Sequence, residues 1–112
     1  MSVALLEDLF TAWRALDARR AAALFTADGT YAEAGKPPLV GRDAMIAHWE
    51  PFFKLGAFWR LEIDEVFGDG TRFAVRYRWS EDRADGSSHH HDGCALVRTR
   101  AGAVADYREY AG

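Results

Sequence analysis

The second half of the 112-residue chain consists of four strand-like runs separated by short turns. These runs restrict the folds that the chain can adopt. The runs span residues 58–67, 72–80, 88–99 and 103–110. The turns between them, at residues 68–70, 85–86 and 101–102, each contain glycine, which adopts the positive φ that tight hairpin turns require. The pattern predicts four consecutive antiparallel strands.

The second run shows the alternation of a strand most clearly. Phe73, Val75, Tyr77 and Trp79 occupy every second position, and mostly arginine and small residues lie between them. This period of two is typical of a strand with one buried face. The aromatic face needs a cover, which the residues before position 58 must form.

The first 25 residues have the spacing of two helices. Ser2 can cap the first helix, over residues 3–16, and Asp17 can cap a second, short helix that runs to Phe25. The apolar stripe of the first helix consists of Leu6, Leu9, Phe10, Trp13 and Leu16. Both helices are therefore expected to pack on the sheet.

A short strand at residues 30–34 and a third helix complete the first half. Gly35 and two prolines end the strand, and the helix begins at Gly41. Pro51 lacks an amide donor, so we expect a kink or break near Glu50. Helices on one face of an antiparallel sheet make an α+β domain.

Composition limits the class of protein. The length and the 49% hydrophobic content fit one globular domain over residues 1–112. The net charge of −3 offers no basic footprint for nucleic acid, and no apolar run is long enough for a membrane span. Cys94 is the only cysteine, so no internal disulfide forms, and no signal peptide is recognisable. We therefore expect a cytoplasmic protein.

Four stretches of the sequence, in this order, resemble the nuclear transport factor 2-like superfamily. They are residues 24–31 (LFTADGTY), 39–46 (LVGRDAMI), 94–98 (CALVR) and 102–110 (GAVADYREY). Within that superfamily the chain is most similar to small SnoaL-like (polyketide cyclase-type) and ketosteroid isomerase-like proteins. The resemblance implies a cone, in which a strongly curved antiparallel sheet wraps around a long helix and leaves an apolar pocket at its open end.

The resemblance also implies a homodimer through the outer face of the sheet. The alternation places charged residues on that face, namely Arg60, Glu62, Asp64, Arg76 and Arg78. Opposite charges could pair there across a two-fold axis.

Glu33 is the first candidate for a catalytic residue. Aligned through residues 28–30, it falls where the resemblance to ketosteroid isomerases implies the general base. A carboxylate in an apolar pocket has a raised pKa, which suits removal of a proton next to a carbonyl group. The alternative is a solvated carboxylate at a strand edge.

The rest of the isomerase site is missing from this sequence. The acid that stabilises the oxyanion would fall at Ala95, and its partner tyrosine near Leu9 or Phe10. The supporting tyrosines fall at Phe25 and Trp49. Without hydrogen-bond donors for the oxyanion the largest catalytic effect is lost, which argues against steroid isomerase activity.

A run of three histidines and an aspartate, residues 89–92, is the most unusual stretch. If Ala95 faces inward, alternation places His91 at the mouth of the pocket, where it could donate a proton and form an acid/base couple with Glu33. The alternative is a solvated strand start, which we favour for His89 and His90. Neighbours on one strand supply at most two ligands on a face, so we expect no metal site and no cofactor.

Other residues are expected to line the pocket or the core. The candidates for the pocket lining are Tyr31, Trp49, Tyr77, Trp79, Ala95 and Tyr107. An aromatic stripe is also typical of a plain core. His48 is expected to lie on the flank of the third helix with a satisfied hydrogen bond.

Three functions remain open from the sequence. The first is a cofactor-independent enzyme of isomerase, cyclase or lyase type that acts on a small carbonyl compound. The second is a protein that binds a small hydrophobic molecule without catalysis. The third is a dimerisation domain with a filled interior.

Overall fold

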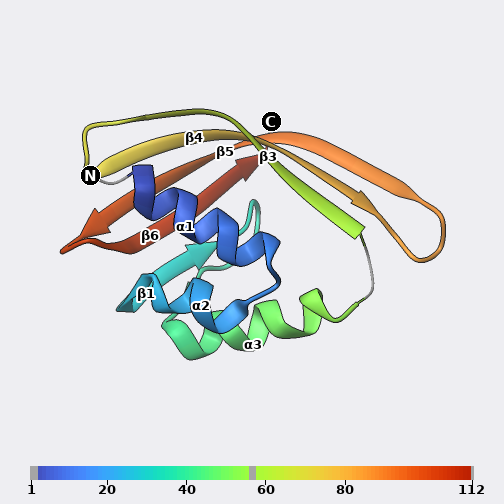
Figure 1. Ribbon diagram of the computed structural model, residues 1–112, viewed down its shortest axis with the longest axis horizontal. Coiled ribbons are helices and arrows are strands. Elements are labelled where there is room, and N and C mark those ends of the chain that lie inside the picture. The colour runs from blue at the N-terminus through green and yellow to red at the C-terminus, as the bar shows by residue number, and fades with distance from the viewer. Residues whose placement is uncertain (1–2, 56–57, 112) are drawn as a thin grey trace.

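The structure is a computed structural model that describes residues 3–55 and 58–111. Its elements are α1 (Val3–Arg14), α2 (Ala18–Ala23), β1 (Phe25–Ala32), β2 (Leu39–Val40), α3 (Arg42–Phe53), β3 (Phe58–Gly68), β4 (Arg72–Asp82), β5 (Ser88–Arg100) and β6 (Ala103–Ala111). The three helices lie on one side of a curved sheet, which confirms the α+β cone (Figure 1). No helix within the described ranges is long and apolar enough to cross a membrane.

The sheet has six strands in the order β2-β1-β6-β5-β4-β3. Strands β3 to β6 form the predicted antiparallel series. Strand β1 pairs with β6 in parallel, with Tyr31 opposite Tyr107, so the sheet is mixed rather than wholly antiparallel. This pairing also explains why β1 begins at Phe25 and not at residue 30, because the contact with β6 draws the earlier residues into the sheet.

Helices α1 and α2 follow the predicted pattern with two corrections. Leu16 was expected on the buried stripe, but it has a φ of 58° and is about half exposed, since a left-handed residue ends the helix and turns away from the core. Helix α2 ends at Ala23, so Phe25 is buried as part of β1 instead. Asp17 caps α2 as predicted, with its carboxylate accepting from the amide of Arg20 at 3.0 Å. The predicted cap of α1, Ser2, lies outside the described residues.

Helix α3 begins after Gly41 and continues through Pro51 to Phe53. We expected a kink or break near Glu50, and the break is absent: the helix loses only the hydrogen bond that an amide at position 51 would have donated, and it ends two residues later. Met45 and Trp49 on its inner side are buried.

The concave face of the sheet forms the core with α1. Phe73, Val75 and Tyr77 of β4 are buried beside Ala95 and Val97 of β5, as the period of two predicts. Arg14, the last residue of α1, connects this helix to β3. Its Nε and Nη2 both donate to the carbonyl oxygen of Leu61, at 3.2 and 2.7 Å. The core fills the narrow end of the cone and leaves the other end open.

Candidate functional site

The open end of the cone contains a cavity of about 450 Å³. This volume lies in the range of sites for small organic molecules. The side chains that line it are mostly aromatic, and the complete lining is Trp13, Tyr31, Glu33, Ala34, Lys36, His48, Trp49, Phe52, Phe53, Trp59, Leu61, Tyr77, Trp79, Glu81, His91 and Glu109. The cavity therefore combines an apolar wall with a few polar groups.

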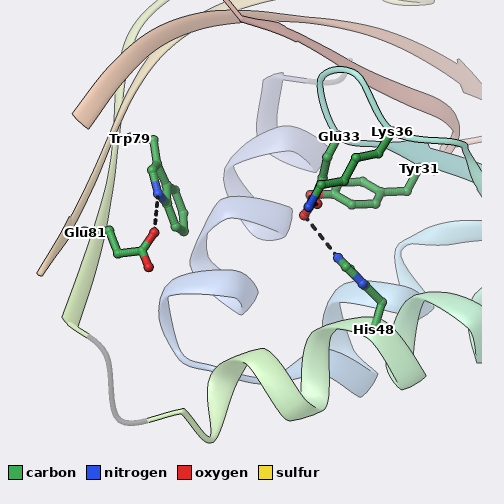
Figure 2. A network of polar contacts seen from close by, with 6 residues as sticks. All are labelled: Tyr31, Glu33, Lys36, His48, Trp79 and Glu81. Carbon is green, nitrogen blue, oxygen red and sulfur yellow. Dashed lines mark hydrogen bonds and ion pairs between the residues drawn. The ribbon is translucent and has the colours of Figure 1, made fainter. Parts of the chain in front are cut away.

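Glu33 lies on the wall of this cavity, in the loop directly after β1. Its Oε2 lies 3.1 Å from Nε2 of His48 on α3 and accepts a weaker hydrogen bond from the Tyr31 hydroxyl at 3.4 Å. Its Oε1 lies 3.2 Å from Nζ of Lys36, in the same loop. Figure 2 shows His48 reaching from its helix toward the carboxylate, with Lys36 and Tyr31 beside it.

The environment of Glu33 corrects one sequence-based expectation. Burial by itself raises the pKa of the carboxyl, but the hydrogen bonds and positive charges of His48 and Lys36 outweigh it and hold the pKa below its ordinary value. The expected raised pKa is therefore wrong. Glu33 is ionised at neutral pH and is a weaker base than an unpaired glutamate.

A second carboxylate, Glu109 of β6, shares the cavity. Burial and the negative charge of Glu33 raise the pKa of Glu109 to about 7, although the charge of Lys36 opposes this. Among residues 3–55 and 58–111, no side chain makes a hydrogen bond or ion pair with it. Of the three carboxyl groups that line the cavity, Glu33 and Glu109 thus have pKa values on opposite sides of the ordinary value.

The inner wall is a cluster of aromatic rings. The ring centroid of Trp49 lies 5.1 Å from that of Tyr31 and 5.6 Å from that of Trp13, both edge to face. Tyr107 and Ala95, which we expected in the lining, are completely buried behind these rings. They support the wall and do not face the cavity.

The mouth of the cavity carries a second aromatic group. The indoles of Trp59 and Trp79 stack at 4.9 Å and 17°. Trp79 Nε1 donates to Glu81 at 3.3 Å, on the side of the cavity opposite Glu33 (Figure 2). This part of the wall is partly exposed, so it forms the entrance.

His91 lies at the entrance as well. It is opposite Trp79 in the β4–β5 register, lines the cavity and is exposed, with its ring edge-on to Tyr77 at 6.2 Å. His89 and His90 are also exposed. Among the described residues, no group of three histidine, cysteine, aspartate or glutamate side chains is arranged to hold a metal ion.

Sequence reasoning missed three functional groups of the cavity. His48 has the expected satisfied hydrogen bond, but its partner is Glu33, and it lines the cavity. No sequence pattern indicated Lys36, because its contact with Glu33 depends on the conformation of the loop that holds both residues. Glu109 had a usable signal, since it lies two residues after Tyr107 on the same strand face.

An open cone with an aromatic cavity between sheet and helices is the nuclear transport factor 2-like architecture. The family model of the SnoaL-like domain matches residues 6–107, and the chain belongs to this family. A search of curated protein sequences found no significant match.

Solved structures share the fold at low sequence identity. A hypothetical protein with a ketosteroid isomerase-like fold from Catenulispora acidiphila, in complex with trimethylamine, has a TM-score of 0.86 at 17% identity, over 98% of this chain and 86% of that one. A nuclear transport factor 2-like protein of unknown function from Burkholderia pseudomallei has a TM-score of 0.85 at 17% identity, over 100% and 92%. An LEH-like epoxide hydrolase from M. tuberculosis has a TM-score of 0.82 at 14% identity, over 96% and 80%. At these identities the likeness shows the fold alone.

Proposed function

We propose that the cavity binds a small, mostly apolar organic molecule and that the protein is a cofactor-independent acid/base enzyme of isomerase, cyclase or lyase type. The observation that carries this proposal is an ionised carboxylate, Glu33, fixed on the wall of an aromatic cavity of about 450 Å³. A positioned carboxylate can take a proton from a carbon next to a carbonyl group.

Glu33 is the base in this proposal, and His91 is the proton donor at the entrance. The carboxylate takes the proton from the carbon, the electron pair moves toward the carbonyl oxygen, and a ring N–H of His91 donates its proton to that oxygen. Because His48 and Lys36 lower the basicity of Glu33, the substrate needs an acidified C–H bond, for example between two electron-withdrawing groups.

Two of the structural relatives support a small-molecule role. The protein from Catenulispora acidiphila was crystallised with trimethylamine, and the M. tuberculosis relative is an epoxide hydrolase. The first relative holds a small organic molecule, and the second is an enzyme with the same fold.

Binding without catalysis is the second candidate function. It is favoured by the absence of a hydrogen-bond donor at Ala95, Leu9 and Phe10, and by the low pKa of Glu33. A protein of this kind would use the same cavity and would leave bound carbonyl compounds unchanged.

Deuterium exchange separates the two functions without knowledge of the natural substrate. Small cyclic ketones, beginning with 2-tetralone, are incubated with the protein in D₂O, and the loss of the proton signal next to the carbonyl is followed by NMR. We expect exchange faster than in buffer, abolished by Glu33→Gln and kept by the matched change Glu7→Gln on the exposed side of α1. Ketones that shift the protein's NMR signals but exchange at the buffer rate would favour the binding function and contradict catalysis.

We also propose a homodimer through the outer face of the sheet. Arg76 is already paired with Asp64 and Glu65, and Arg78 with Asp92, so these arginines are satisfied within the chain. The side chains of three other arginines on strands β4 to β6 form no salt bridge within the described residues, namely Arg72, Arg98 and Arg108, although Arg72 interacts with Asp69 through its charge. They surround exposed apolar side chains on the same face, Leu96 and Tyr110.

A two-fold axis near Leu96 would place this basic end over the acidic end of the same face, at β3, in the partner. Sedimentation at tens of micromolar should give a dimer, and Leu96→Glu should shift it to a monomer (a working range typical of specific dimers). A wild-type monomer at that concentration would contradict the proposal.

A further inference from the structure

Glu109 is a partly buried carboxylate that the proposed proton transfer does not use. It projects from β6 into the cavity, and its cross-strand neighbour on β5, Ala95, offers it no polar group. An unpaired charge in an apolar wall costs free energy. A carboxylate at such a position is therefore typical of a binding site whose ligand supplies the opposite charge.

The positive groups that line or adjoin the cavity are already engaged elsewhere. Lys36 Nζ lies 3.2 Å from Glu33, and the only hydrogen bond of His48 among the described residues also goes to Glu33. Arg83 Nε lies 3.1 Å from Oε2 of Glu81 and is paired with it. Lys36 acts on Glu109 only through its charge, and within the described ranges none of these cations forms an ion pair or hydrogen bond with Glu109.

The surroundings of Glu109 combine aromatic rings with several charged and titratable groups. These groups are Tyr31 on β1, Glu33 and Lys36 in the loop after it, His48 on α3, Tyr77 and Glu81 on β4, His91 on β5 and Tyr107 on β6. Glu33 carries a negative charge at neutral pH, and His48 and Lys36 lie within hydrogen-bonding distance of it.

Aromatic faces attract cations, and eight aromatic side chains line this cavity. The stacked pair of Trp59 and Trp79 presents such a face at the entrance, and Trp49 and Tyr31 present others deeper inside. An apolar cation gains from these faces while its alkyl groups replace water on the wall.

We propose that the ligand of this cavity is an organic ammonium ion, a secondary or tertiary amine with an apolar body, whose N–H donates to Glu109. This inference deepens the proposed function and rests on it only in taking the cavity as a small-molecule site. A metal ion fits less well, because fewer than three ligating side chains of the described residues converge there. An anionic ligand would face the three glutamate side chains of the lining, Glu33, Glu81 and Glu109.

Binding of matched probes tests the proposal. The probes are N,N-dimethylcyclohexylamine, its neutral counterpart cyclohexyl methyl ketone, and cyclohexanecarboxylate, each titrated against the protein by two-dimensional NMR at about pH 8 and about pH 5.5. We expect the amine to bind most tightly at the higher pH and about 30-fold more weakly at the lower one, because a proton returns to Glu109, whose pKa is about 7.

The Glu109→Gln variant should weaken amine binding by about 30-fold or more, as expected for removal of one partner of a buried charge pair, and should leave ketone binding nearly unchanged. The matched variant Glu7→Gln should behave as wild type. Equal affinity for amine and ketone, or amine binding that survives Glu109→Gln, would overturn the proposal.

The outcomes also separate this proposal from the proposed function. Ketone binding that strengthens at low pH, with no preference for the amine, would make protonated Glu109 a hydrogen-bond donor and refute the ammonium site while leaving proton transfer intact. Amine binding without any deuterium exchange of ketones would refute the enzyme and leave the ammonium site standing. Failure of all three probes to bind at either pH would overturn both.

Discussion

Replacing Trp49 by alanine should lower the free energy of unfolding by about 3–5 kcal/mol, the range for truncation of a packed tryptophan. Trp49 is 3% exposed, and its ring contacts those of Trp13, Tyr31 and Phe25 at centroid distances of 5.6, 5.1 and 6.0 Å. The same ring also forms part of the cavity wall. Its loss therefore removes three aromatic contacts and opens the cavity into the core.

Urea denaturation followed by far-ultraviolet circular dichroism measures this effect. With an m-value of about 2 kcal/mol/M, a loss of about 4 kcal/mol moves the midpoint down by about 2 M. Trp49→Phe keeps a ring in the cluster and should cost less, which gives a measurable variant if the alanine protein does not fold. A midpoint that barely changes, together with lost ligand binding, would show that Trp49 serves the cavity and not the core.

Three further substitutions test individual features. Leu16→Gly should raise the free energy of unfolding by up to about 1 kcal/mol, because glycine adopts the φ of 58° without strain; an unchanged or lower value in urea denaturation would contradict this. Lys36→Met should raise the pKa of Glu33, followed by carboxyl NMR, since one of its two positive partners is removed. Gly93→Ala should destabilise by about 1–3 kcal/mol, because the added Cβ would lie 2.5 Å from the hydroxyl oxygen and 2.6 Å from Cζ of Tyr77; Tyr77→Leu, which removes both atoms, should make the further cost of Gly93→Ala smaller.

Alternation along the strands made the fold predictable. The period of two placed Phe73, Val75 and Tyr77 on the buried face, and the glycine turns fixed the order of the four long strands. The parallel pairing of Tyr31 with Tyr107 was not predictable in this way, because it joins residues 76 positions apart through backbone contacts that leave no local pattern. Leu16 was misplaced because helical spacing does not reveal where a helix ends.

The site was predictable only in part. The position of Glu33 followed from a family resemblance, but its pKa depends on distances to His48 and Lys36 that are set by tertiary structure. Glu109 could have been found, because its spacing from Tyr107 places both on one face of β6. Burial of a glutamate among aromatic residues is a tertiary property, and the sequence alone describes it as an ordinary charged residue.

The proposed proton transfer depends on an ionised Glu33, and the ammonium site depends on an unpaired Glu109 in the same cavity. Carbon-13 NMR of the glutamate carboxyls, titrated from acid to mildly alkaline pH, measures this directly, with Glu33→Gln and Glu109→Gln used to assign the two signals. We expect Glu33 to titrate below the ordinary glutamate value and Glu109 at about 7. Two carboxyls that both titrate like solvent-exposed glutamates would contradict the account, because neither the fixed base nor the unpaired anion would then exist.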